Sequence, residues 1–128
     1  MKNEYAERSH GTANPPYDLK DRTKAFALRV IRLVESLPRT ATGNVIGRQL
    51  LRCGTSVGAN YRAACRARSS AEFCSKMGIV EEEADESIYW MELLIDAKLV
   101  APELMANLIN EANEPLAIVV ASIKTARH

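Results

Sequence analysis

Charged side chains of opposite sign gather in two neighbouring segments of the chain. Residues 43–68 carry five arginines and no acidic residue, whereas residues 69–97 carry one lysine and eight acidic residues. A guanidinium matches two phosphate oxygens at once, so the basic segment is a candidate surface for RNA or DNA. Ion pairs between the two segments would use the same side chains, and the composition leaves both interpretations open. The arginines of this segment are Arg48, Arg52, Arg62, Arg66 and Arg68.

The acidic run "EEEADE" at residues 81–86 raises the question of a metal site. A two-metal site inside a helical bundle needs Glu-x-x-His motifs on facing helices. The chain has only two histidines, His10 and His128, and both lie near a terminus. We therefore predict no metal site and no cofactor. Without an interior histidine no nucleophile and base can be paired, so the chain is predicted not to be an enzyme.

The three cysteines, Cys53, Cys65 and Cys74, show no CxxC spacing and lie among apolar or small residues. This pattern favours buried free thiols over metal ligands or a redox pair.

The segment "LRCGTSVGAN" places Gly54 and Gly58 four residues apart. A phosphate-binding P-loop needs a longer G-x-x-x-x-G-K-S/T motif after a strand, so the pattern does not fit that site. On a helix the two glycines share one face, where a neighbour can approach closely. We predict Tyr89 and Trp90 as the large partners of this face, with base stacking as the alternative role of their rings. The groups predicted to hydrogen-bond across the contact are Thr55, Ser56 and Asn60.

The elements that must position these residues are helices, because apolar residues recur at three- and four-residue steps. The pattern predicts helices from Asp18 to Leu37, from Gly43 to Ala67, from Ser70 to between Asp96 and Leu99, and from Pro102 to Ile123. Thr40 or Thr42 is predicted to cap the second helix, and Ser69 with Glu72 the third. Pro115 predicts a kink or a break at residues 111–114, because an interior proline removes a backbone hydrogen bond.

Four helices with short connections predict an all-α protein, an antiparallel up-and-down four-helix bundle at residues 18–128. Residues 1–17 lack a period and contain Asn14-Pro15-Pro16, which predicts a mobile tail. An antiparallel pairing of the second and third helices would bring Arg52 near Glu83 and Glu86, and Arg62 and Arg66 near Glu72 and Lys76.

A length of 128 residues is typical of a single domain, and a net charge of +1 gives the chain no strong overall field. No apolar run is long enough to span a membrane, and the first residues lack the apolar core of a signal peptide. We expect a soluble, cytoplasmic protein without a membrane partner.

Three motifs resemble one known family: "LRCGTSVGAN" at residues 51–60, "RARSSAEF" at residues 66–73, and "EEADE" followed by Tyr89 and Trp90. The chain is similar over residues 19–125 to the 23S rRNA intervening-sequence proteins, also called the S23 ribosomal protein family. The resemblance implies a left-handed four-helix bundle that assembles as a homopentamer and has no known enzymatic activity. Many relatives carry a glutamate where this chain has Ala63.

Members of this family accompany nucleic-acid machinery, so the resemblance implies RNA, DNA or a nucleic-acid-associated protein complex as partner. The alternative is a purely structural or protein-interaction homo-oligomer whose arginines pair with acidic residues. Around a ring of copies Arg29, Arg32 and Arg48 would align into a basic belt. The candidate nucleic-acid-binding residues are Arg29, Arg32, Arg48, Arg52, Arg62, Arg66 and Arg68. The candidate helix-packing or subunit-interface residues are Gly54, Gly58, Asn60, Glu83, Glu86, Tyr89 and Trp90.

Overall fold

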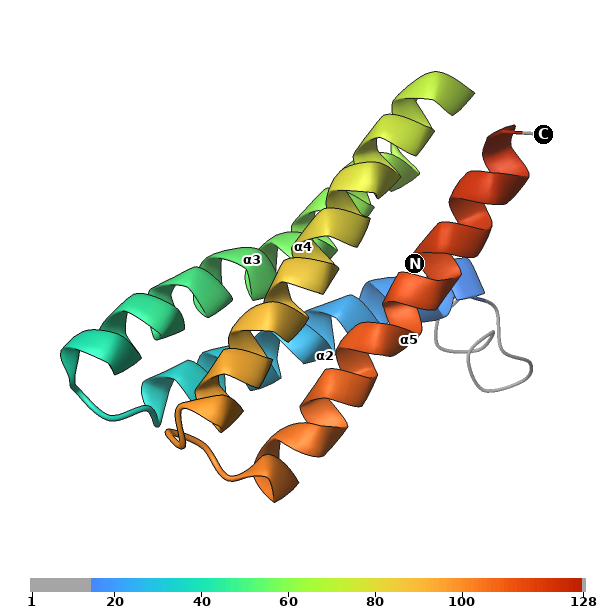
Figure 1. Cartoon of the computed structure of the whole chain (residues 1–128). Coiled ribbons are helices and arrows are strands. Elements are labelled where there is room, and N and C mark those ends of the chain that lie inside the picture. Colours follow the sequence, from blue (N-terminus) through green and yellow to red (C-terminus); the bar gives the residue numbers. More distant parts are fainter. Residues whose placement is uncertain (1–14, 128) are drawn as a thin grey trace.

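The computed structural model describes residues 15–127, which form four long helices joined by short loops (Figure 1). The described residues contain no strand. The helices are α2 (Pro15–Glu35), α3 (Ala41–Cys65), α4 (Ser70–Asp96) and α5 (Pro102–Arg127).

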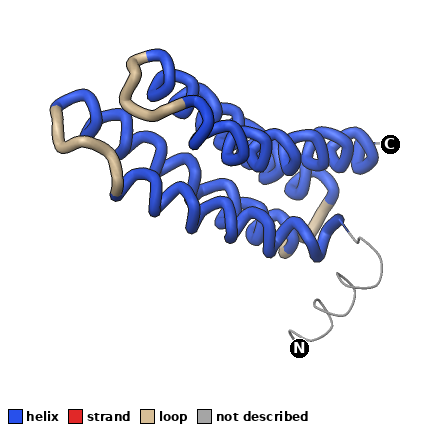
Figure 2. The backbone as a smooth tube through the Cα atoms, turned by 90° about the horizontal axis from the view of Figure 1, so that it is seen from below, coloured by secondary structure: helices blue, strands red, loops and turns tan. Residues whose placement is uncertain are grey.

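The four helices form an up-and-down bundle. Each helix contacts the next along the chain, and α5 returns to contact α2, which closes the bundle. The α2–α3 and α4–α5 loops lie at one end and the α3–α4 loop at the other (Figure 2). The predicted fold class is therefore confirmed, whereas the left-handedness of the bundle stays a prediction. No helix among the described residues is long and apolar enough to cross a membrane.

The ends of α2 differ from the prediction. The helix begins at Pro15, ahead of the predicted Asp18, because prolines fit the first turn of a helix, where their missing N–H would have no partner. The predicted tail otherwise falls on residues 1–14, which lie outside the described residues. The last turn tightens before Pro38, since the amides of Ser36 and Leu37 donate to carbonyls three residues back.

The predicted caps of α3 and α4 are confirmed. The Thr40 hydroxyl accepts a hydrogen bond from the Gly43 amide at 3.1 Å, and the Ser69 hydroxyl accepts one from the Glu72 amide at 3.0 Å. The Glu72 carboxylate accepts in turn from the Arg68 amide at 2.9 Å, so it satisfies the amide just before the cap.

Helix α5 runs through Pro115 as one helix, so of the two predicted alternatives at residues 111–114 the break does not occur, and the kink stays a prediction. Tertiary packing offsets the lost backbone bond, because Met105, Leu108 and Ala112 in the turns before the proline are all buried.

The core lies along the bundle axis and receives buried side chains from all four helices. Its fully buried members include Phe26, Leu50, Met91 and Met105. One buried polar group is Ser87, whose hydroxyl donates to the Glu83 carbonyl at 2.8 Å and lies 3.3 Å from the Cys53 sulfur. The polar atom is therefore satisfied within its own helix.

The glycines of α3 face α2. A Cβ atom added at Gly54 would lie 3.0 Å from both γ carbons of Val30, and one at Gly58 would lie 3.0 Å from the Thr23 hydroxyl. At Gly47 it would meet Leu37 at 3.1 Å. The side chains of α2 therefore rest directly on the backbone of α3, which only glycine permits at this distance.

The prediction of Tyr89 and Trp90 as partners of this glycine face is wrong, because those rings stand on α4 and the glycines turn to α2. The predicted hydrogen bonds across the contact are also absent from the described residues. The Thr55, Ser56 and Asn60 side chains instead donate to carbonyls of their own helix at 2.7 to 2.9 Å. A short polar side chain on a helix reaches the preceding turn more readily than a neighbouring helix.

Two glycine-to-alanine substitutions should have opposite effects on stability. Gly78 on α4 has nothing within 4 Å of an added Cβ, so Gly78→Ala should stabilise the fold by about 0.5–1 kcal/mol through helix propensity. Gly54→Ala should instead destabilise it by about 1–3 kcal/mol, because the buried Val30 must move. Urea unfolding of the two variants measures both values; equal stabilisation would contradict close packing at Gly54.

Candidate nucleic-acid interface

Arg52 pairs with α4, as the antiparallel register predicts. Its guanidinium lies 3.4 Å from Glu83 Oε1 and 2.5 Å from Glu86 Oε2, and it also donates to the Gln49 side chain at 3.1 Å. Arg52 is therefore a link between two helices of one chain.

Trp90 joins this network. Its indole N–H donates to Glu86 Oε2 at 3.1 Å, so one carboxylate oxygen accepts from Arg52 and from Trp90. The Tyr89 ring stands edge-on to Trp90 with 5.0 Å between ring centroids, and Tyr89 is 54% exposed. Tyr89 thus belongs to the outer surface of α4, Trp90 is half-buried against the core, and neither belongs to the glycine contact.

Arg29, which we predicted in a basic belt, pairs with α5. Arg29 Nη1 lies 2.8 Å from Glu111 Oε1, and Arg22, seven residues earlier on α2, contacts Glu114, three residues later on α5. Glu111 Oε1 is shielded from solvent and makes no hydrogen bond of regular geometry among the described residues, and the Arg29 guanidinium is its ion-pair partner. These two pairs join α2 to α5.

Other arginines have no ion-pair partner within the described part of the chain, and their residues are exposed. Among the described residues, the arginines that form ion pairs are Arg22, Arg29 and Arg52. The exposed arginines outside these pairs are Arg32, Arg39, Arg48, Arg62, Arg66 and Arg68.

The predicted proximity of Arg62 and Arg66 to Glu72 gives no ion pair in the described residues. Arg52 meets Glu83 and Glu86, so the antiparallel register places Arg62 opposite residues 73–76, where the only charged side chain is Lys76. The Glu72 carboxylate is engaged at the start of α4 with the Arg68 amide. The arginines in the last turns of α3 therefore form no ion pair with acidic residues of α4.

The free arginines of α3 follow one face. Arg48 and Arg62 are fourteen residues apart, close to four helical turns, and Arg66 follows four residues later. Arg52 lies on the same stripe, four residues after Arg48, and is the member that reaches α4, whereas the glycine face contacts α2. This leaves a row of guanidinium groups about 27 Å long on the exposed side of α3, at 1.5 Å of rise per residue.

The bundle also separates charge between its two hairpins. Residues 15–68, which form α2 and α3, hold eleven Lys or Arg and three Asp or Glu, a net charge of +8. Residues 69–127, which form α4 and α5, hold four Lys or Arg and eleven Asp or Glu, a net charge of −7. A chain that is almost neutral overall therefore has one strongly basic side and one strongly acidic side.

The cysteines only partly follow the prediction of buried free thiols. All three are free, but Cys53 alone is buried, Cys74 is half-buried and Cys65 is exposed at the end of α3. Burial raises the pKa of the Cys53 thiol, so this sulfur stays protonated and unreactive in the fold. Within the described residues no group of His, Cys, Asp and Glu side chains is arranged to hold a metal ion.

Sequence reasoning missed two sets of residues that the structure brings together. Glu111 and Glu114 partner α2, which follows only once α5 is known to close against that helix. Arg39 and Asn44 line a pocket at the α2–α3 loop with Arg48. The N-cap predicted at Thr40 indicated where this loop ends, but it did not indicate that a pocket lies beside the loop.

The architecture defines a class: a small helical-bundle protein with one basic and one acidic hairpin. The family model of the 23S rRNA-intervening sequence protein matches residues 17–121. The chain therefore belongs to the 23S rRNA-intervening sequence protein family.

A solved structure supports this membership. The chain is similar to a protein of unknown function from the S23 ribosomal protein family of Bacteroides thetaiotaomicron, with 36% identity and a TM-score of 0.80. The match covers 85% of this chain and 97% of that chain. No curated protein matches the chain.

The shared acceptor at Glu86 gives a test of the α3–α4 network. Glu86→Ala removes the partner of Arg52 and of Trp90, so it should destabilise the fold by about 0.5–1.5 kcal/mol. It should also shift the fluorescence of Trp90, the one tryptophan of the chain. Glu82→Ala is the matched control, since Glu82 is exposed and pairs with no described residue. Identical melting curves and spectra for the two variants would refute the network.

Proposed function

We propose that this protein is a non-enzymatic, oligomeric nucleic-acid-binding protein, with RNA as its ligand. The observation that carries the proposal is the row of arginines on the exposed face of α3, at Arg48, Arg62 and Arg66, which no acidic side chain neutralises in the described residues. Guanidinium groups without a partner on a solvent-facing helix are well suited to phosphate oxygens.

The charge of the basic hairpin supports the same ligand. A net charge of +8 over residues 15–68 is concentrated on one side of the bundle, where it attracts a polyanion in spite of the near-zero charge of the whole chain. The family description, which refers to an intervening sequence of 23S rRNA, agrees with an RNA ligand. The proposal places the protein in the cytoplasm, without a membrane partner.

A second candidate function, a purely structural homo-oligomer, is favoured by the opposite charges of the hairpins. The +8 hairpin of one copy and the −7 hairpin of another are complementary, which suits a head-to-tail contact that closes into a ring. Exposed apolar side chains stand on both hairpins, among them Ile31 and Leu51 on the basic one and Leu104 on the acidic one. The resemblance to the family makes a homopentamer the expected ring.

RNA binding should depend steeply on salt and on the exposed arginines. Arg48→Ala/Arg62→Ala should weaken binding to a labelled structured RNA and lower the slope of log K against log salt by roughly 1.4–1.8, since each phosphate contact adds about 0.7–0.9. Fluorescence anisotropy from about 50 to 200 mM salt measures the slope. Lys98→Ala/Lys124→Ala removes the same charge from the acidic hairpin, at exposed positions away from Arg62, and should leave the slope unchanged. Absence of binding at about 50 mM salt would defeat the RNA proposal.

The oligomeric state is tested separately, by measuring the mass of the assembled protein. Native mass spectrometry of the full chain should give a homopentamer, and raised salt should shift it toward smaller species, because screening weakens contacts between opposite charges. Arg62→Ala/Arg66→Ala should keep the mass and lose RNA affinity if these arginines bind RNA. Loss of assembly in this variant would assign them to subunit contacts, and a monomer at roughly 50 µM would rule out the ring.

A further inference from the structure

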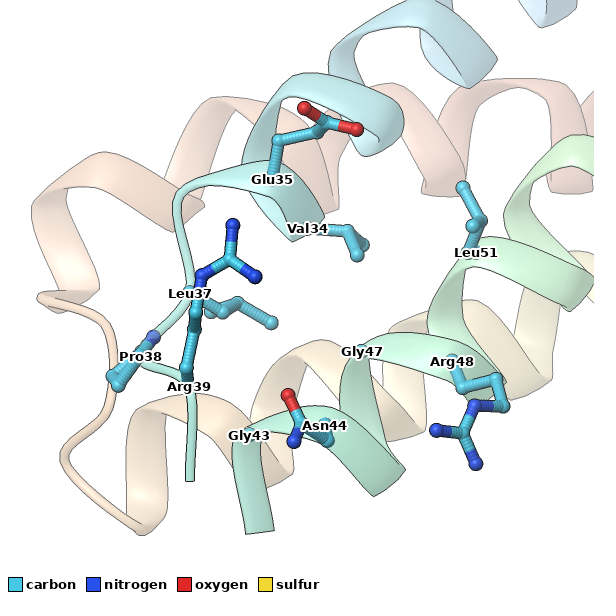
Figure 3. Close-up of a pocket in the computed structure, with 10 residues that line it drawn as sticks. All are labelled: Val34, Glu35, Leu37, Pro38, Arg39, Gly43, Asn44, Gly47, Arg48 and Leu51. Atoms are coloured by element: carbon cyan, nitrogen blue, oxygen red, sulfur yellow. The ribbon is translucent and has the colours of Figure 1, made fainter. Parts of the chain in front are cut away.

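A pocket of about 300 Å³ lies between the end of α2 and the first turns of α3 (Figure 3). Val34 and Leu37 point into it from the α2 side, and Leu51 bounds it on the α3 side. At Gly47 the backbone is already covered by Leu37 and Val34, so the open space lies outside these side chains and not between them and α3. A flat apolar group can therefore rest on the outer surface of these aliphatic side chains.

The rim of this pocket is polar. Glu35 and Arg39 stand on the side of α2 and its loop, and Asn44 and Arg48 stand on α3 (Figure 3). Neither guanidinium has an ion-pair partner among residues 15–127. Arg48 is directed outward from the pocket toward the exposed side of α3. Four of the ten lining residues thus carry a charge or an amide around an apolar interior.

We propose that this pocket holds one unpaired nucleotide of the bound nucleic acid, an inference that rests on the proposed function and specifies its site. The base lies against Val34, Leu37 and Leu51, and its edge meets the Asn44 amide and the Glu35 carboxylate. Arg39 and Arg48 contact the phosphates on either side of the nucleotide. Recognition of RNA by proteins commonly uses such a splayed-out base, because its edges are accessible only when it is unpaired.

The chemistry of the rim selects the base. A carboxylate only accepts hydrogen bonds, so Glu35 favours a base with an exocyclic amino group. Cytosine offers such a donor at N4, whereas uracil, a base of the same size, has a carbonyl oxygen in its place. The pocket should therefore prefer cytidine to uridine.

The position of the pocket connects it to the arginine row. A strand that leaves the pocket past Arg48 runs along the exposed side of α3, where Arg62 follows at about 21 Å, at 1.5 Å of rise per residue. The pocket recognises one base, and the row of arginines on α3 binds the phosphates of the nucleotides that follow it. An apolar side chain of a second copy is the competing occupant, but it would make no use of the two cations and the amide.

The test uses the full chain and two probes. Fluorescence anisotropy with labelled twelve-residue oligocytidine and oligouridine at about 50 mM salt measures strand binding. Saturation-transfer NMR with cytidine and uridine monophosphates measures occupation of the pocket itself. We expect oligocytidine to bind roughly tenfold more tightly than oligouridine, and Glu35→Gln to reduce that ratio toward one.

Matched variants separate the pocket from general charge. Asn44→Phe fills the pocket from its rim and should abolish the cytidine monophosphate signal, whereas Val45→Phe, at the next exposed position of α3 and outside the pocket, should not. Arg48→Ala should weaken the monophosphate signal, and Arg62→Ala should weaken strand binding alone. Circular dichroism and melting curves check that each variant folds.

Each possible result of these experiments either supports or overturns the proposed nucleotide site. Equal binding of the two oligonucleotides, together with identical effects of Asn44→Phe and Val45→Phe, overturns the pocket and leaves the arginine row as the RNA site. A change of native mass in Asn44→Phe with unaltered RNA binding also overturns it and assigns the pocket to a second copy. No strand binding but a cytidine monophosphate signal that Asn44→Phe removes defeats the proposed function and supports a nucleotide pocket. Absence of both signals defeats both.

Discussion

The close approach of α2 to the backbone of α3 is the constraint on which the rest of the molecule depends. Val30 and Thr23 sit where side chains of α3 would otherwise stand, at Gly54 and Gly58. Each glycine inside a helix destabilises the fold by roughly 0.5–1 kcal/mol relative to alanine, so the packing of α2 against α3 must stabilise the fold by more than this. It does so by burying Val30 completely and by fixing the rotation of α3 about its own axis, since only one face of that helix can accept α2 at this distance.

That rotation decides what the charged residues of α3 can do. With the glycine face on α2, the neighbouring face meets α4 and brings Arg52 to Glu83 and Glu86. The remaining face has no helix over it, so Arg48 and Arg62 face solvent. Ion pairing, one of the two interpretations of the sequence, thus holds for Arg52, whereas the proposed phosphate binding uses Arg48 and Arg62.

The features that were predictable from the sequence are those that depend on local chemistry or on register. A hydroxyl followed three residues later by an amide or a glutamate marks a cap, as at Thr40 and Ser69, and register alone brings Arg52 to Glu86. The partner of the glycine face was not predictable, because a small-residue face does not say which neighbour covers it. The Arg29–Glu111 pair needs contact between the first and last helices, which no local pattern encodes. The break at Pro115 failed because packing along α5 outweighs one lost backbone bond.

The distribution of acids along α4 explains why the basic face stays open. The acids of this helix other than Glu72 begin at Glu81, and an antiparallel partner of Arg52 at Glu83 and Glu86 leaves residues 73–80 beside the last turns of α3. That stretch carries Lys76 and no acid, so α4 offers Arg62 no acidic partner where it pairs with Arg52. A helix that served only to compensate the charge of α3 would carry its acids along its whole length. The asymmetry therefore favours an external anion as the partner of the α3 arginines over a role in holding the bundle together.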